Sequence, residues 1–375
     1  FSIQYFEFSA MEEANEETPE ETLKEIQYNE EDVLGQGAYA KVFRGTFHGR
    51  EVAVKRVDVL HFTHIEREID ALIKSDKHVN VIRYFGTESN TKFHFLALEF
   101  CLASLYDHVQ KKIPDITLTT EAILEQTTKG LDHLHSISIV HRDLKPHNIL
   151  FCSGGKQLRA VISDFGLSKM IRPDHNSLSN GSGTVGTHGW MAPEVLMGAS
   201  TSYPIDIFSL GCIIYYVVTN GSHPSVDFQL VMIKTPESRN LIAACLNYSP
   251  ANRPSASAVL FHPFFWEKRY QLEFFCDVSD RFVGEGYKSS LSKRIQKNGA
   301  NVITSNWIER LCDPMQQNVK LSNGIRRPYV CWSVRSLLRL IRNIRHHPRQ
   351  LPQELLYLGN SKHELVLYFT SRFPD

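Results

Sequence analysis

Apolar and polar positions alternate with two different periods in the first hundred residues. Over 28–101, short apolar runs separated by turns are typical of strands: DVLGQGAYAKVFRGTF, REVAVKRV, VIRYFG and FHFLALEF. Between these runs, Phe62, Ile65, Ile69 and Leu72 recur at the spacing of one helix face. The pattern predicts a small β-rich unit that contains one helix.

The pattern then becomes mainly helical, and polar loops interrupt it. The loop over 171–189 is rich in Ser, Gly and Asn, which indicates a mobile segment. We therefore expect an α+β chain with four parts. They are an acidic linker over 1–27, a β-rich lobe over 28–101, a helical lobe over 102–266 and an all-α unit over 267–375.

The segment SVRSLLRLIRNIRHHP at 333–348 predicts a helix with one apolar and one basic stripe. The apolar stripe consists of Val334, Leu337, Leu338 and Ile341, and the basic stripe of Arg335, Arg339, Arg342 and His346. Pro348 should end this helix, because the residue before a proline disfavours helical geometry. His347 is then expected at the helix terminus, where its imidazole can turn toward a ligand.

Charge is distributed unevenly, although 41 basic and 41 acidic residues balance. Residues 11–32 hold ten acidic side chains and one basic one, Lys24. Residues 314–353 hold no acidic side chain but Lys320 and seven arginines. This asymmetry predicts a solvated acidic linker and a basic region that faces an anion.

The seven cysteines are scattered and never form a C-x-x-C pair. This spacing predicts reduced thiols in the cytosol, and argues against disulfides and against a zinc site. No apolar run reaches the length of a membrane span, and no signal peptide opens the sequence.

A glycine-rich turn and two charged residues suggest a phosphate site in the β-rich lobe. In GQGAYAKV at 35–42, Gly35 and Gly37 let the backbone approach a polyphosphate. Lys55 lies in the middle of a strand, where an unpaired ammonium would be costly. A phosphate and the carboxylate of Glu68 on the following helix would offset that cost.

The motifs HRDLKPHN at 141–148 and SDFG at 163–166 add phosphate-transfer chemistry. Asp143 is placed to accept the proton of a substrate hydroxyl, and Lys145 to screen the transferred phosphoryl group. Asn148 and Asp164 supply the hard oxygen ligands that Mg²⁺ prefers.

The order and spacing of these motifs, with MAPE at 191–194 and NRPSA at 252–256, resemble the protein kinase family over residues 30–266. The resemblance implies serine/threonine phosphorylation with ATP and Mg²⁺, and a pair between Glu194 and Arg253. It also implies nucleotide contacts from Val42, Ala53, Glu99 and Cys101. Ser177, Ser179 and Ser182 of the mobile loop lie where phosphates could pair with Arg142.

The basic region near the C-terminus suggests a second chemistry. Eight cationic side chains in forty residues without a carboxylate resemble an electrostatic footprint for nucleic acid. Tyr329, Arg342, Asn343 and His347 suit phosphodiester cleavage, in which RNA supplies its 2′-hydroxyl as nucleophile. A base and an acid are then needed around a developing negative phosphorane.

HRDLKPHNIL, GTHGWMAPE, HPFFW, RNIRHHPRQLP and YFTSRFP together resemble the inositol-requiring enzyme family of the unfolded protein response, from about residue 28 to 375. The resemblance implies a kinase fused to a helical ribonuclease domain on the cytosolic side of the endoplasmic reticulum membrane. It implies His347 as general acid, Tyr329 as base, and Arg342 and Asn343 as phosphate holders. It further implies phosphorylation of the loop serines, cleavage of stem-loop RNA to a 2′,3′-cyclic phosphate, and dimers or higher oligomers.

Two other functions remain open from the sequence. One is an ordinary serine/threonine kinase whose C-terminal unit is a docking module. The other is a nucleotide-sensing scaffold with ribonuclease activity and no useful phosphotransfer.

Overall fold

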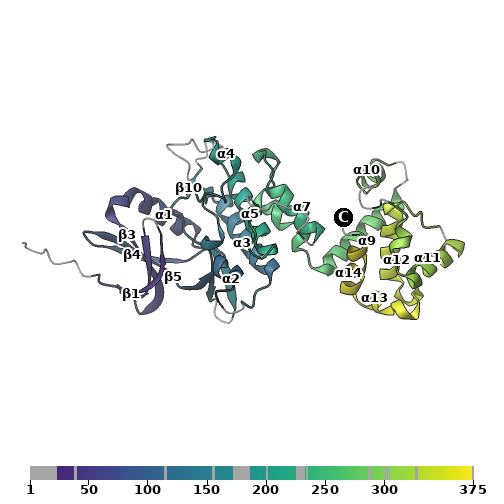
Figure 1. The fold of residues 1–375 in the computed structure, drawn as a ribbon, viewed down its shortest axis with the longest axis horizontal. Helices are drawn as coiled ribbons and strands as arrows, with labels where there is room; N and C mark the ends of the chain where they lie inside the picture. The colour runs from purple at the N-terminus through teal and green to yellow at the C-terminus, as the bar shows by residue number, and fades with distance from the viewer. Residues whose placement is uncertain are drawn as a thin grey trace, which may run out of the picture.

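The structure is a computed structural model, and it extends from a β-rich lobe at one end to a helical domain at the other (Figure 1). It describes residues 23–37, 40–113, 116–153, 157–171, 186–199, 202–224, 233, 235–285, 289–299, 303, 305–325 and 328–373.

The small lobe is an antiparallel five-stranded sheet with the order β1-β2-β3-β5-β4 and a helix, α1, that follows β3. Its elements are β1 (Ile26–Gln36), β2 (Ala40–Phe47), β3 (Arg50–Asp58), α1 (Phe62–Ser75), β4 (Tyr84–Ser89) and β5 (Phe93–Glu99). Ile65 and Leu72 of α1 are buried, as the apolar spacing predicts. The same helix carries Glu68 on its buried side.

The large lobe combines helices with two small sheets, whose strand orders are β6-β8-β9 and β10-β7. Strand β6 follows β5 directly along the chain. Its strands are β6 (Cys101–Ser104), β7 (Ile139–Val140), β8 (Ile149–Ser153), β9 (Leu158–Ile162) and β10 (Lys169–Met170). Its helices are α2 (Leu105–Val109), α3 (Thr120–Ser136), α4 (Pro193–Leu196), α5 (Pro204–Val218), α7 (Pro236–Cys245) and α8 (Ala256–Leu260). Helix α5 is buried along almost its whole length and forms the centre of this lobe.

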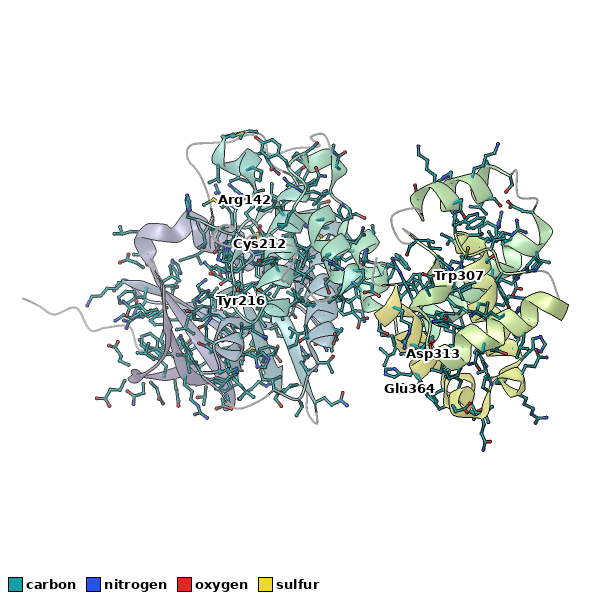
Figure 2. The ribbon with its side chains drawn as sticks, turned by 45° about the vertical axis from the view of Figure 1, so that its right-hand side comes forward. Arg142, Cys212, Tyr216, Trp307, Asp313 and Glu364 are labelled. Carbon is teal, nitrogen blue, oxygen red and sulfur yellow. A yellow bond between two sulfur atoms is a disulfide. The ribbon has the colours of Figure 1, made fainter. Side chains whose placement is uncertain are left out.

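The C-terminal domain is helical and has its own core around Trp307, which is fully buried (Figure 2). Its helices are α9 (Lys268–Gly284), α10 (Ser290–Asn298), α11 (Asp313–Ile325), α12 (Val334–His346), α13 (Leu356–Asn360) and α14 (Lys362–Arg372). Helix α12 buries Leu337, Leu338 and Ile341, and it ends at His346 before Pro348. The predicted helix and its apolar stripe are therefore confirmed.

The expectation of reduced cysteines alone is wrong at one pair. Cys101 and Cys152 form a disulfide that links β6 to β8. The antiparallel register of these strands places the two residues directly opposite each other. Spacing along the sequence could not show this pairing, because the two residues are 51 positions apart.

None of the helices in the described part of the chain is long and apolar enough to cross a lipid bilayer.

Candidate active sites

Lys55 on β3 pairs with one carboxylate of its own lobe and one of the large lobe. Its Nζ donates to Glu68 Oε1 on α1 at 2.6 Å and to Asp164 Oδ1 at 2.9 Å. Glu68 is 3% exposed, so its charge requires a partner of opposite sign. The three residues come from the sheet, its helix and the segment after β9, and the contacts hold these elements in one arrangement.

The charges in this cluster reinforce one another. The Lys55 ammonium lowers the pKa of the Asp164 carboxyl to about 2. Burial alone would lower the pKa of Lys55, but Asp164 and Glu68 together raise it above its usual value. Asp164 is therefore ionised at neutral pH. Its backbone has a φ of 62°, a strained conformation that is frequent at functional sites.

Asp143 lies at the centre of a second hydrogen-bonded cluster. Lys145 Nζ donates to its Oδ2 at 2.7 Å, and Asn148 Nδ2 donates to its main-chain oxygen at 2.8 Å. Thr187 Oγ1 donates to Asp143 Oδ1 at 2.6 Å and accepts from Lys145 Nζ at 2.6 Å. Thr187 lies in GTHGWMAPE, 44 residues after Asp143, and its sequence pattern did not predict this contact.

Asp206 of α5 fixes the loop that carries Asp143. The main-chain N–H groups of His141 and Arg142 donate to its two carboxylate oxygens at 2.8 and 2.9 Å. His135 Nε2 lies 3.0 Å from Oδ2. Burial would raise the pKa of Asp206, but its hydrogen bond with His135 and the other contacts lower it overall. The sequence did not predict this role of Asp206. Its hydrogen bond to the Arg142 N–H stabilises the left-handed backbone conformation of Arg142, which has a φ of 71°.

Arg253 holds the segment that carries Glu194 against the large lobe. Its Nη1 and Nη2 donate to the two oxygens of Glu194 at 2.6 and 2.8 Å. This bidentate pair is the one that the kinase resemblance implies, and the Arg253 side chain is fully buried.

The remaining nucleotide-site candidates of the small lobe lie on or next to the neighbouring strands β1, β2 and β3. Strand pairing places Gly35 opposite Val42, and Val42 opposite Lys55. Ala53 is buried on β3, and the main-chain N–H of Gly37 donates to the main-chain oxygen of Ala40 at 2.8 Å.

Residues Glu99 and Cys101 connect the two lobes. The Glu99 carboxylate forms an ion pair with Arg159, and the Cys101 sulfur is in the disulfide. Contacts of these two residues with a nucleotide would therefore come from their main-chain groups. Ser177, Ser179 and Ser182 lie outside the described residues.

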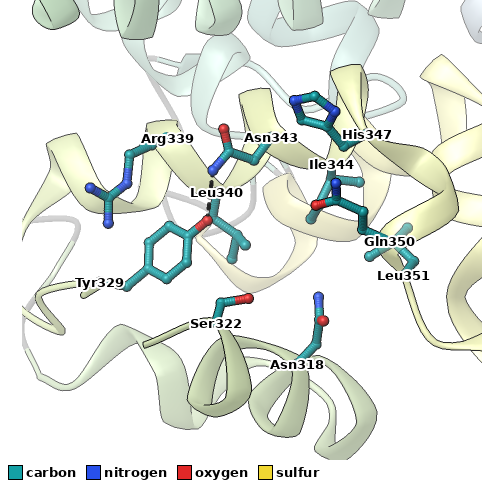
Figure 3. Close-up of a pocket in the computed structure, with 10 residues that line it drawn as sticks. All are labelled: Asn318, Ser322, Tyr329, Arg339, Leu340, Asn343, Ile344, His347, Gln350 and Leu351. Carbon is teal, nitrogen blue, oxygen red and sulfur yellow. Dashed lines mark hydrogen bonds between the residues drawn. The ribbon is translucent and has the colours of Figure 1, made fainter. Parts of the chain in front are cut away.

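The C-terminal domain contains a pocket of about 270 Å³ at the end of α12 (Figure 3). Tyr329, Asn343 and His347 all line it. Asn343 Nδ2 donates to the Tyr329 hydroxyl oxygen at 2.8 Å. His347 is exposed at the helix terminus. Its main-chain N–H donates to the main-chain oxygen of Asn343 at 2.8 Å. The structure thus brings together three of the four residues that the sequence suggested for phosphodiester cleavage.

Trp307 and Arg339 fix the position of Tyr329. The Trp307 indole Nε1–H donates to the Val330 oxygen at 2.9 Å, and its ring meets the Tyr329 ring edge-to-face at 6.3 Å. The Arg339 guanidinium lies 4.5 Å from the centre of the Tyr329 ring, and its Nη2 donates to the Pro328 oxygen at 2.7 Å. The VCW turn at 330–332 is therefore anchored on the domain core.

Arg342 is the predicted site residue that does not line the pocket. Its guanidinium forms an ion pair with Asp280 of α9. Arg335 also faces α9, because it donates to the Phe282 oxygen and lies over the Phe282 ring. The basic stripe predicted on α12 is therefore divided between α9 and the Tyr329 side.

Family comparisons match the chain in two segments. The protein kinase domain matches residues 28–265, and ribonuclease 2-5A matches residues 271–375. The serine/threonine-protein kinase/endoribonuclease ire-1 of Caenorhabditis elegans is 45% identical over 93% of this chain and 38% of its own length. The human serine/threonine-protein kinase/endoribonuclease IRE2 is 44% identical over 93% of this chain and 40% of its own length.

A more distant relative is the sensor for unfolded proteins in the ER ire1 of Schizosaccharomyces pombe, at 34% identity over 92% of this chain and 36% of its own length. The chain therefore spans well under half the length of these relatives. The matches confirm the resemblance that the motifs indicated. The chain belongs to the protein kinase family, and a segment of the ribonuclease 2-5A family follows its kinase domain, in keeping with the name kinase/endoribonuclease that its relatives carry.

Proposed function

We propose that this chain is a bifunctional enzyme. One half is a serine/threonine protein kinase that phosphorylates other copies of itself, and the other is a metal-independent, sequence-specific endoribonuclease that cleaves stem-loop mRNA. The observation that carries the proposal is the hydrogen-bonded pair of Tyr329 and Asn343 beside His347, in a domain that follows a complete set of kinase motifs.

A protein kinase domain uses ATP, typically with Mg²⁺, and the residues present fit both groups. Lys55, held by Glu68, offers a fixed positive charge to the phosphates of ATP or ADP. Asn148 and Asp164 offer hard oxygen ligands for Mg²⁺. When bound, the metal ion neutralises charge on the phosphates. Gly35, Gly37, Val42, Ala53, Glu99 and Cys101 would surround the rest of the nucleotide.

For phosphotransfer, Asp143 would accept the proton of the substrate hydroxyl, and Lys145 would screen the transferred group. Thr187 hydrogen-bonds to both side chains, and it would hold the Asp143 carboxylate and the Lys145 ammonium in their positions relative to each other. We propose Ser177, Ser179 and Ser182 as the acceptors, with Arg142 as a partner for their phosphates.

For RNA cleavage, the 2′-oxygen would attack the adjacent phosphorus, and the bond from phosphorus to the 5′-oxygen would break. Tyr329, as a phenolate, would take the 2′-hydroxyl proton, and the His347 imidazolium would protonate the departing 5′-oxygen. Asn343 orients the Tyr329 oxygen, and with Arg342 it would hold the phosphate once Arg342 leaves Asp280. The products would be a 2′,3′-cyclic phosphate and a 5′-hydroxyl.

We further propose that the chain acts as an effector of unfolded-protein signalling on the cytosolic face of the endoplasmic reticulum membrane. The Schizosaccharomyces pombe relative is named a sensor for unfolded proteins in the ER, which supports this setting. Membrane contact would come through a segment outside this sequence. Homodimers and higher oligomers would assemble the ribonuclease, and nucleotide would favour assembly only by binding that form more tightly.

The test is cleavage of a hairpin RNA by the purified protein, with and without nucleotide. His347→Ala should abolish cleavage, whereas Asp143→Ala should retain it and lose transfer of labelled phosphate to the protein. His346→Ala, an exposed neighbour, is the matched control for His347. Equal cleavage by wild type and His347→Ala would contradict the ribonuclease proposal and leave the kinase function alone. Phosphate transfer by Asp143→Ala would contradict the role of Asp143 in phosphotransfer.

A further inference from the structure

The pocket beside Tyr329 has two walls of different chemistry. Tyr329, Asn343 and His347, which carry the proposed cleavage, lie on the side of α12. Asn318 and Ser322 of α11 face them from the opposite side (Figure 3). Among the described residues, α11 contributes an amide and a hydroxyl to the pocket, so this wall is neutral.

The orientation of the α11 wall is fixed by the domain core. Met315 and Val319 are fully buried and pack α11 into this core. Asn318 and Ser322 are four residues apart, so they lie one helical turn apart on one face. Neither side chain has a hydrogen-bond partner among the residues that the structure describes. Two half-exposed polar groups are thus presented to the pocket, where a ligand can hydrogen-bond to them in place of water.

The floor between the two walls is apolar. Leu340 and Ile344 of α12 and Leu351 beyond Pro348 line the pocket and are buried. An apolar floor below unpaired polar groups is typical of a site that takes a flat, partly polar ligand. A nucleobase has this character, since its faces are apolar and its edge carries donors and acceptors.

We infer that Asn318, with Ser322 beside it, hydrogen-bonds to the base of one nucleotide next to the scissile phosphate and selects the base there. The inference rests on the proposed ribonuclease function. The phosphate belongs near Asn343 and His347, so a neighbouring nucleoside has to enter the same pocket. Among the described residues, the α11 side of the pocket carries no cation for a second phosphate, whereas an amide offers the paired donor and acceptor that match a base edge.

The experiment uses hairpin RNAs that carry each of the four bases on either side of the cleaved bond. We expect wild type to discriminate at one of these positions. Asn318→Ala should lower the ratio of kcat/KM between the best and the poorest base by about tenfold. Most of that change should be a loss on the best substrate, with the poorest cut at nearly the wild-type rate.

Asn318→Asp keeps the shape but has acceptors alone, so it should shift the preference toward bases that present a donor. Ser322→Ala should weaken discrimination at the same position. Gln317→Ala removes an exposed amide from the same helix and should leave the preference unchanged. Circular dichroism and phosphotransfer by each variant establish that it is folded.

The outcomes separate this inference from the proposed function. If wild type cuts no hairpin, the ribonuclease proposal fails, and the base-selecting role fails with it. If wild type cuts and discriminates but Asn318→Ala and Ser322→Ala keep its preference, the inference alone is overturned. An equal loss by Asn318→Ala on all four bases also overturns it, because that result describes a structural or phosphate-binding role.

Discussion

The arginines at helical spacing on α12 contact different parts of the domain. Arg335 and Arg342 are seven residues apart, so they return to the same face of the helix, and both are used by α9. Arg339 lies between them in sequence and faces Tyr329 instead. The positive charge that is available to attract RNA is therefore smaller than the number of arginines suggests. The contact of Arg339 with the Tyr329 ring favours a role in positioning Tyr329.

Arg339→Ala is expected to reduce the kcat for RNA cleavage roughly 10- to 100-fold, because a slightly misplaced reacting group loses much of its effect. The variant loses the cation over the Tyr329 ring and the hydrogen bond to Pro328. Single-turnover cleavage of a hairpin at saturating protein measures this step apart from binding. Phosphotransfer should be unchanged.

The matched control for Arg339→Ala is Arg349→Ala, which removes an exposed positive charge near the same pocket. It should weaken RNA binding at low salt and leave the single-turnover rate intact. If both variants lower the rate equally, Arg339 acts through general charge and does not position Tyr329.

At the scale of elements, the local sequence pattern predicted the helices and helix ends that depend on one segment alone. The spacing of Ile65 and Leu72 predicted α1, and Pro348 predicted the end of α12. Thr187, Asp206 and Trp307 could not be found in this way, because their roles depend on which distant segments meet. The Cys101–Cys152 disulfide was missed for the same reason, since it follows from the register of β6 on β8.

The contact of β3 with the segment after β9 should make stability depend on pH. Lys55 holds the pKa of Asp164 near 2, below its ordinary value of 3.8. A lowered carboxyl pKa adds stability that is fully present above the ordinary value and is lost as the pH falls toward 2. Lys55→Met should therefore lower the free energy of unfolding most near neutral pH, where both carboxylates lose their ammonium partner, and by less below pH 4.

Denaturant unfolding of both proteins at a series of pH values measures this difference. Lys41→Met, which removes an exposed lysine from the neighbouring strand β2, is the control and should give a difference that does not vary with pH. A constant difference for Lys55→Met down to pH 3 would show that the ion pair with Asp164 contributes nothing.

At the scale of the whole molecule, the two halves have separate hydrophobic cores. One contains the β3, α1, α3 and α5 side chains of the kinase lobes, and the other contains those of α11, α12 and α14 around Trp307. Separate cores unfold as separate cooperative units unless their interface is extensive. Any coupling between nucleotide binding and RNA cleavage therefore has to pass through contacts between domains or between copies of the chain.

This separation predicts two thermal transitions in differential scanning calorimetry. Arg253→Ala leaves Glu194 without its partner, and breaking a buried ion pair costs about 3–5 kcal/mol, so the kinase transition should move down alone. Leu365→Ala opens a cavity in the other core and should lower only the second transition, at a cost of about 2–5 kcal/mol. ADP with Mg²⁺ should raise the kinase transition alone, because a ligand stabilises the unit that binds it. If ADP or either variant instead shifts both transitions together, the halves unfold as one unit, and nucleotide can act on the ribonuclease without any change of assembly.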